Sequence, residues 1–237
     1  SIDTEIISVV EENYGRKNVE LTLVLFPPFI EVVTNNTLNK GSKYKYFPNK
    51  IIQEAIAITG KPKQAYYTQC DTLEIDSLIH LNIYSVNIAS INILMENIDK
   101  TKIKIKEIVP FFYYVGKNIC RANNNSILFY KTLGKNAKMT TYVMIYSGQF
   151  LITYRKLYED DDKLMEELFR TLNYVQNEVI DFNVDELVVI DNAVDKNLLI
   201  NMFSAEQIKK LTFEEFLYLR NEKQKAKSNK KEEVKNE

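Results

Sequence analysis

The sequence predicts an α/β fold in which mixed sheets are flanked by helices. Leucine and valine recur at helical spacing over residues 164–179, which predicts a long amphipathic helix. The continuous apolar run 186–190 then predicts a strand buried on both faces, and extended runs between residues 126 and 154 predict an antiparallel meander. Because helices and strands alternate, the helices must cover sheets.

The first part of the chain predicts a hairpin that leads into a loop. Two extended runs, residues 6–10 and 19–25, flank a turn-rich segment. Pro27-Pro28 ends the second strand, because proline cannot donate to a strand ladder. The polar stretch 34–42 predicts a loop.

Four more elements are expected before residue 111. Residues 49–59 carry an apolar stripe, and Gly60 suits the position after a helix, so a helix is predicted there. Residues 64–73 look extended. Residues 86–97 are too rich in apolar side chains for an exposed helix, which predicts a segment buried between layers. The alternation of lysine and isoleucine over residues 102–110 predicts a half-buried strand.

The second half contains turn and capping patterns that set the element boundaries. Ser147-Gly148 is a two-residue hairpin pattern between strands. Asp160–Asp162 offers carboxylates to the start of the long helix. A helix is expected over residues 196–203, and the capping boxes Ser204–Gln207 and Thr212–Glu215 predict two short helices.

Composition and charge exclude several classes of function. The 31 Lys and Arg balance 32 Asp and Glu, which argues against nucleic acid as a partner. Cys70 and Cys120 form no metal-binding array and fit reduced cytosolic thiols. His80 is the only histidine, so no Ser/His/Asp or Cys/His catalytic arrangement can form within the chain. With no apolar run of membrane length, we expect a soluble chain.

The order of meander strands, helix and strand is found in shortened form near the start and in full after Ser126. This arrangement resembles the duplicated actin-like ATPase fold, which is ribonuclease H-like. Residues 1–11 resemble the opening strand of the PilM family of type IV pilus assembly, which follows an Asp-Ile-Gly phosphate loop. Residues 104–110 resemble the family's strand before its second lobe, and residues 164–189 resemble its long helix and the following strand.

This resemblance implies three parts in the chain. Residues 1–115 would form a reduced N-terminal actin-like lobe, and residues 116–220 a C-terminal actin-like lobe. Residues 221–237 are rich in lysine and glutamate with almost nothing to bury, which predicts a disordered tail or tether.

The nucleotide loops depart from the family pattern. Actin-like ATPases hold phosphates with backbone amides of glycine-containing hairpins, because only glycine lets the chain approach so closely. In the first loop Asp3 is retained, but the glycine is missing and Glu5 would place negative charge beside the phosphate. In the second loop Tyr130 replaces the expected aspartate, and Gly134 is displaced.

The adenosine segment departs as well. The family's Gly-Gly pair is Asp191-Asn192 here, and the chain has six glycines with none adjacent to another. We therefore expect no nucleotide, no other cofactor, no metal and no catalysis. The pattern resembles GspL, the type II secretion relative whose actin-like domain is an adaptor without nucleotide.

The resemblance implies a non-catalytic scaffold at the cytoplasmic face of the cell membrane, in a type IV pilus or type II secretion assembly platform. The implied partners are a PilN-like membrane protein and the motor ATPase complex, and a GspL-like arrangement would continue after residue 237 into a membrane helix. Two alternatives stay open. One is a divergent actin-like ATPase that retains nucleotide binding, and the other is an unrelated α/β interaction module.

Aromatic clusters are the candidate partner-binding sites. Four consecutive aromatic residues start at Phe111 and Phe112, and four such side chains cannot all face one core. They either cross the seam between the lobes or form a binding patch. Phe26 and Phe29 flank the proline pair, which indicates a strand end or a docking surface.

Overall fold

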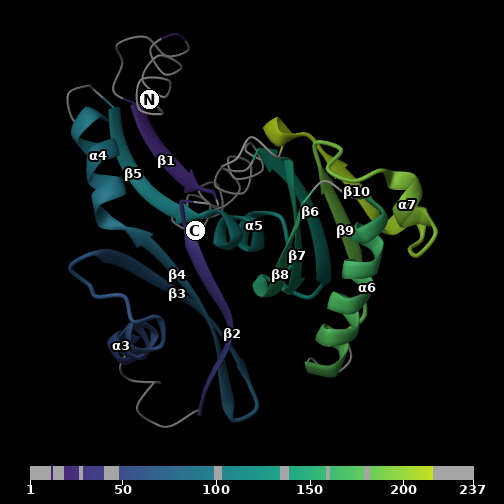
Figure 1. Cartoon of the computed structure of the whole chain (residues 1–237), viewed down its shortest axis with the longest axis horizontal. Helices are drawn as coiled ribbons and strands as arrows, with labels where there is room; N and C mark the ends of the chain where they lie inside the picture. Colours follow the sequence, from purple (N-terminus) through teal and green to yellow (C-terminus); the bar gives the residue numbers. More distant parts are fainter. Residues whose placement is uncertain are drawn as a thin grey trace, which may run out of the picture. The chain divides into compact units, whose positions relative to one another are not determined.

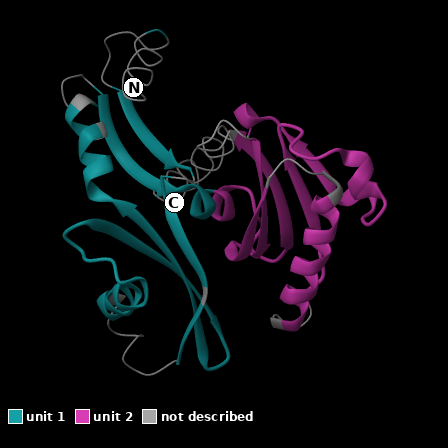
Figure 2. Ribbon diagram, viewed as in Figure 1, with its two compact units in different colours: residues 1–114 teal, residues 115–237 magenta. Residues whose placement is uncertain are grey.

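A computed structural model gives the fold of the chain. It describes residues 12, 19–26, 29–39, 48–98, 103–133, 139–158, 161–178 and 182–215. The predicted strand 6–10 and the predicted tail 221–237 lie outside these residues. The chain divides into two compact units, residues 1–114 and 115–237 (Figure 2). The boundary that the resemblance predicts between the two lobes lies between residues 115 and 116.

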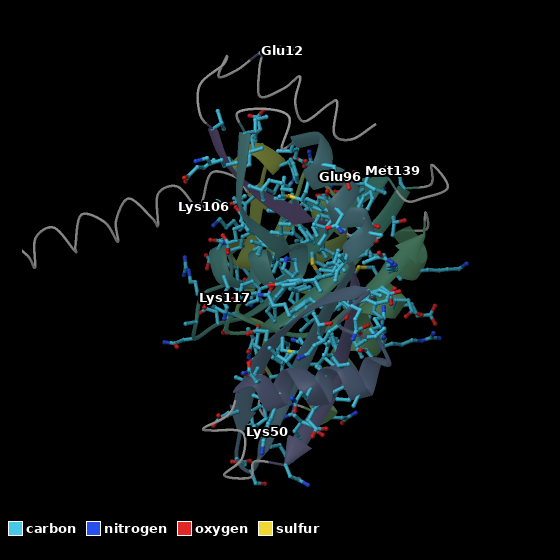
Figure 3. The ribbon with its side chains drawn as sticks, turned by 90° about the vertical axis from the view of Figure 1, so that its left-hand side faces the viewer. Glu12, Lys50, Glu96, Lys106, Lys117 and Met139 are labelled. Atoms are coloured by element: carbon cyan, nitrogen blue, oxygen red, sulfur yellow. The ribbon has the colours of Figure 1, made fainter. Side chains whose placement is uncertain are left out.

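Two parallel strands of the first unit form a small sheet. β1 (Val19–Leu25) pairs with β5 (Ile103–Pro110), and a bulge leaves Lys106 without a register partner. Ile103 is buried while Lys104 and Lys106 are exposed, which confirms the predicted half-buried strand. Lys106 and Glu96 are both exposed, and both are labelled in Figure 3.

A second sheet of the first unit has the strand order β2-β4-β3. β4 (Leu78–Asn87) lies between β2 (Glu31–Asn39) and β3 (Tyr66–Ile75), and both pairings are antiparallel. The predicted loop over residues 34–42 is wrong for residues 34–39. These polar residues belong to β2, because β4 supplies their hydrogen-bond ladder on the far side of a bulge between Val33 and Asn36.

Helix α3 (Pro48–Thr59) covers one face of this sheet (Figure 1). Ala55 is fully buried against Leu81 and Ile83 of β4. Gly60 follows the helix at φ +65°, a backbone conformation that glycine adopts without strain. The predicted helix, its apolar stripe and its final glycine are confirmed.

Helix α4 (Ile88–Ile98) corrects one prediction. Residues 86–97 were expected to be buried between layers, but most of this segment is a helix with one face in solvent, and Ile93 is 60% exposed. The Asn87 side chain accepts a hydrogen bond from the Ala89 N–H at 2.9 Å and so starts the helix. At the end of the helix Ile98 is buried and packs against Ile103.

The second unit contains one five-stranded sheet in the order β10-β9-β6-β7-β8. The meander is confirmed: β6 (Asn125–Leu133), β7 (Met139–Ser147) and β8 (Phe150–Tyr158) pair antiparallel. β9 (Glu186–Ile190) lies parallel to β6, as its apolar sequence predicts, and its last four residues are buried. The sequence did not predict β10 (Ile208–Leu211), which pairs in parallel with β9.

The second unit also contains two helices, α6 and α7, and a 3-10 turn within its described residues. α6 (Asp161–Glu178) buries Leu164, Leu168 and Val175 on one stripe, which confirms the predicted long helix (Figure 1). α7 (Lys196–Ile200) is shorter than the predicted 196–203. The capping box of Ser204 and Gln207 is present but starts a 3-10 turn, Ala205–Gln207, since the next residues enter β10.

Two glycines of the second unit allow close backbone approaches. Gly148, in the turn between β7 and β8, has φ +56°, and its N–H donates to the Asn124 carbonyl at 2.9 Å. A Cβ at Gly148 would lie 2.4 Å from the Ala122 carbonyl oxygen, and a Cβ at Gly116 of α5 (Phe111–Asn118) would lie 2.3 Å from the Gln149 carbonyl oxygen. Both positions therefore exclude a larger side chain without movement of the backbone.

No helix in the described part of the chain is long and apolar enough to cross a lipid bilayer.

Candidate functional site

The carboxyl ends of three parallel strands meet at one edge of the five-stranded sheet. Tyr130 of β6 is in register with Ile190 of β9, and Ile190 is in register with Leu211 of β10. In open α/β sheets ligands bind outside the carboxyl ends of parallel strands. This edge is therefore where a ligand of the predicted fold would be expected.

Asp191 immediately follows β9 and is held by the segment after β10. Its N–H donates to the Leu211 carbonyl at 2.9 Å, and its carboxylate accepts a hydrogen bond from the Phe213 N–H at 2.7 Å. Asp191 and Asn192 both have positive φ, +49° and +52°, which aspartate and asparagine tolerate better than most residues. The Asn192 side-chain oxygen accepts a hydrogen bond from the Lys210 Nζ at 3.1 Å.

Tyr130 is covered by the aromatic ring of Phe213. The two rings are stacked, with centroids 6.1 Å apart and planes at 27°. Tyr130 is 8% exposed, and burial raises the pKa of its phenol, with the negative charge of Asp191 adding to the rise and a hydrogen bond with Thr132 opposing it. The phenol therefore stays neutral at physiological pH.

A second capping box fixes the helical turn that begins at Phe213. The Thr212 N–H donates to the Glu215 carboxylate at 2.8 Å, and the Glu215 N–H donates to the Thr212 hydroxyl at 3.1 Å. These reciprocal bonds confirm the predicted capping box. Asp191 adds a third side-chain acceptor at the same turn, so side chains of this chain bind the N–H groups of Thr212, Phe213 and Glu215.

The structure brings together three of the six positions predicted for the altered nucleotide loops. Tyr130, Asp191 and Asn192 lie at the one edge described above. Asp3, Glu5 and Gly134 lie outside the described residues.

Sequence reasoning missed Phe213 and Lys210, which contact this edge. One sequence feature could have found Phe213: an apolar residue at the first position of a capped helix has no partner in its own first turn. Lys210 carries no comparable feature in the sequence.

The predicted aromatic site residues lie in the first unit and differ in exposure. Phe111 and Phe112 are fully buried, and the Phe26 ring lies 4.4 Å from the Phe111 ring between centroids. Phe29 is 54% exposed. Of these four side chains, Phe29 is therefore the one that is mostly open to solvent.

A polar cluster of the first unit was also not predicted. Asp71 of β3 pairs in register with Asn82 of β4, and the Tyr84 and Tyr113 rings meet edge to face at 6.4 Å. Burial raises the pKa of both tyrosines, and Asp71 adds to each rise. The sequence feature that could have indicated this cluster is a single aspartate within an extended run.

The cysteines and histidine have no common site. Cys70 and Cys120 are free thiols in different units, and burial with the charge of Asp71 raises the pKa of Cys70 to about 11. Among the residues that the structure describes, no cluster of three or more histidine, cysteine or acidic side chains could hold a metal ion.

Solved structures resemble this chain although no family model and no curated protein matches it. The chain superposes on one from the PilM-PilN type IV pilus biogenesis complex with a TM-score of 0.59 and 10% sequence identity, covering 89% of this chain and 74% of the other. The fold is actin-like.

Two further solved structures resemble the chain less closely. One is a protein of actin-like ATPase fold and unknown function from Bacteroides thetaiotaomicron, with a TM-score of 0.44, 12% identity and coverage of 89% and 76%. The other is the cytoplasmic domain of EpsL, an inner-membrane component of the type II secretion system of Vibrio cholerae, with a TM-score of 0.45, 10% identity and coverage of 78% and 66%.

The sheet of the second unit agrees with the actin-like fold predicted from the sequence. Its three meander strands are followed by α6 and by a parallel strand beside the first of them, which is the order expected from the resemblance. The family resemblance places altered nucleotide elements at Tyr130 and at Asp191, and both lie on the carboxyl edge of this sheet.

Proposed function

We propose that this chain is a non-catalytic actin-like adaptor in the assembly platform of a type IV pilus or a type II secretion system. The adaptor would act at the cytoplasmic face of the cell membrane. It would bind a PilN-like membrane protein of the platform, with the motor ATPase complex as a further partner. The likeness of its fold to a chain of a PilM-PilN complex supports this assignment.

The observation that carries the proposal is the set of contacts at the carboxyl edge of the five-stranded sheet. A nucleotide at this edge would have to displace the Phe213 ring from Tyr130. Its adenosine would have to enter beside Asp191, whose carboxylate is already bound to the Phe213 N–H. Both contacts oppose the binding of a nucleotide, so the fold is expected to act through protein contacts.

Calorimetry with ATP and magnesium tests the non-catalytic part of the proposal. We expect no measurable heat of binding at millimolar nucleotide for the full chain. Binding with micromolar affinity would contradict the adaptor role and favour the alternative, a divergent actin-like ATPase.

A pull-down from the native membrane fraction tests the adaptor part. Phe29 is the candidate contact because its ring is mostly exposed, and Phe169 of α6 is a matched control at 52% exposure against 54% for Phe29. We expect the wild-type chain and Phe169→Ala to recover platform proteins and Phe29→Ala to recover fewer. Recovery of no pilus or secretion component by the wild type would contradict the proposal, and equal recovery by both variants would exclude Phe29 as the contact.

A further inference from the structure

β3 is the one outer strand of the described sheets that has no feature to keep a further strand away. Proteins usually protect such open edges with bulges, prolines, lysines or short strands. The β1–β5 pair and β2 contain bulges, and β8 and β10 carry the exposed basic pairs Arg155–Lys156 and Lys209–Lys210. β3 runs for ten residues in unbroken register with β4 and contains no proline, lysine or arginine. It is therefore the strand best suited to accept another.

Alternate residues of β3 direct their backbone groups away from β4. The Ile88 N–H donates to the Ala65 carbonyl at 2.9 Å, and the same register continues to Ile75 opposite Leu78. Because every second residue of an antiparallel strand bonds to a given neighbour, the odd-numbered residues of β3 bond to β4. The even-numbered residues face the other side, where no described strand lies: Thr68, Cys70, Thr72 and Glu74. Their N–H and C=O groups are available to a strand that pairs with β3.

The acidic side chains of β3 restrict the register in which a second copy of the strand could pair with it. When a two-fold axis relates two antiparallel copies, one residue lies opposite itself. A register centred on Asp71 would oppose two carboxylates, which is unfavourable. A register centred on Cys70 instead places Asp71 opposite Gln69 of the second copy, and the Gln69 amide can donate a hydrogen bond to the carboxylate. This register pairs residues 66–74 of both copies.

The other cross-strand neighbours in this register are also compatible. Tyr67, whose side chain is 53% exposed, comes opposite Leu73 of the second copy, and such aromatic and aliphatic pairs stabilise a sheet. Glu74 comes opposite Tyr66, where the Lys61 Nζ lies 4.6 Å from the centroid of the Tyr66 ring. A negative charge of one copy therefore approaches a positive charge of the other. The edge of β3 is complementary to itself in side chains as well as in backbone.

We propose that two copies of this chain associate through β3, paired antiparallel with Cys70 at the two-fold axis. The pairing joins two three-stranded sheets into one continuous sheet. A two-fold contact of this kind closes after two copies, so it produces a dimer and not a fibre. The association goes beyond the proposed function and does not depend on it.

Sedimentation equilibrium of the purified full chain at several concentrations tests the proposal. We expect a reversible equilibrium between monomer and dimer. Because Gln69 faces Asp71 of the second copy, Gln69→Lys should lower the dissociation constant of the dimer about threefold to tenfold, and Gln69→Glu should raise it by a similar factor. Gln176→Lys and Gln176→Glu make the same changes of charge at an exposed position of α6 and should leave this constant unchanged.

A proline at Thr72 tests the edge itself. The Thr72 N–H points away from β4, so Thr72→Pro removes a hydrogen bond of the dimer but none of the bonds to β4. The variant should keep the circular dichroism spectrum of the wild type and sediment as a monomer at every concentration. If Thr72→Pro does not fold, the two Gln69 variants still decide the proposal.

Three outcomes would overturn the proposal. They are a wild-type chain that stays monomeric at all concentrations, a folded Thr72→Pro variant that still forms the dimer, and a dissociation constant that Gln69→Lys and Gln69→Glu shift in the same direction. Since these measurements use the purified chain alone, a failed membrane pull-down would count against the adaptor role and leave the dimer unaffected.

Discussion

The two edges of the five-stranded sheet use their polar residues in opposite ways. At the carboxyl edge Asp191 and Asn192 are bound by β10 and the segment that follows it, and Phe213 covers Tyr130. At the amino edge, where the parallel strands of this sheet begin, four charged side chains line a hollow: Arg121, Glu186, Glu206 and Lys209. The comparison teaches that the polar residues of the carboxyl edge serve contacts within the chain, while these charged side chains of the amino edge have no ion-pair partner among the described residues.

The largest loss of stability is expected at Gly148, in the turn between β7 and β8 at the amino edge of the sheet. Gly148→Ala combines a left-handed φ with a Cβ 2.4 Å from the Ala122 carbonyl oxygen. The backbone strain and the steric conflict should together lower the free energy of unfolding by about 2–4 kcal/mol. Urea unfolding followed by circular dichroism measures this change.

Gly60→Ala is the matched control for that substitution. Gly60 has a similar φ of +65° but no atom within 4 Å of the added Cβ. It should therefore cost about 1 kcal/mol from backbone strain alone. Equal losses at the two positions would mean that the turn does not press against Ala122.

The next effect concerns the cap at the carboxyl edge. Asp191→Gly keeps the positive φ without strain but removes the acceptor for the Phe213 N–H, so it should cost about 1 kcal/mol. Asp191→Asn retains an acceptor oxygen and should stay within about 0.5 kcal/mol of the wild type. If Asp191→Gly leaves the free energy of unfolding unchanged, the hydrogen bond to the Phe213 N–H does not stabilise the edge.

The pH dependence of the same edge follows from Tyr130. Because burial and Asp191 raise the pKa of the folded-state phenol, its neutral form favours folding below the ordinary tyrosine pKa of about 10. That contribution is lost as the pH rises through the folded-state pKa, so wild type should lose more stability above pH 10 than Tyr130→Phe. Unfolding at several alkaline pH values measures the difference.

Asp191→Asn separates the two causes of the raised pKa. The variant should lower the pKa of Tyr130 but leave it above the ordinary value, because burial is the larger cause. Phenolate formation is followed by ultraviolet absorbance in the wild type and in Asp191→Asn, each with and without Tyr130→Phe. Subtracting the curve of the Tyr130→Phe protein from that of its parent gives the titration of Tyr130 alone. An unchanged Tyr130 pKa in Asp191→Asn would show that the carboxylate does not act on the phenol.

The smallest effect is expected for charges at the amino edge. Glu206→Gln and Lys209→Gln remove side chains that have no ion-pair partner within the described residues, so each should change the free energy of unfolding by less than about 0.5 kcal/mol. The urea experiment used for Gly148 measures both. A loss comparable to that of Asp191→Gly would remove the contrast between the two edges.

Regular patterns made much of the fold predictable. The helix at residues 161–178 has the spacing of apolar residues that a helix requires, and the apolar run at 186–190 is short and rich in β-branched residues, which favours a buried strand. β10 was missed because Ile208 to Leu211 is short and has two lysines at its centre, and its pairing with β9 depends on a residue 21 positions earlier in the chain. Helix α4 was wrongly predicted to be buried between layers, because it contains more apolar side chains than it buries.

The candidate site was predictable only in part. Tyr130, Asp191 and Asn192 could be singled out because they differ from the aspartate and the glycine pair that nucleotide binding needs in the family. Their actual partners could not, since the stacking of Tyr130 on Phe213 joins residues more than 80 positions apart. The hollow beside Glu186 was missed for the same reason, because its lining comes from three separate segments.

The late position of β10 has a consequence for biosynthesis. Residues 187–190 of β9 are fully buried, and until β10 has left the ribosome one long edge of this apolar strand is open. An open apolar edge is a template for pairing with other chains. Products that terminate before residue 208 should therefore be aggregation-prone, and nascent chains should need protection by chaperones until β10 emerges.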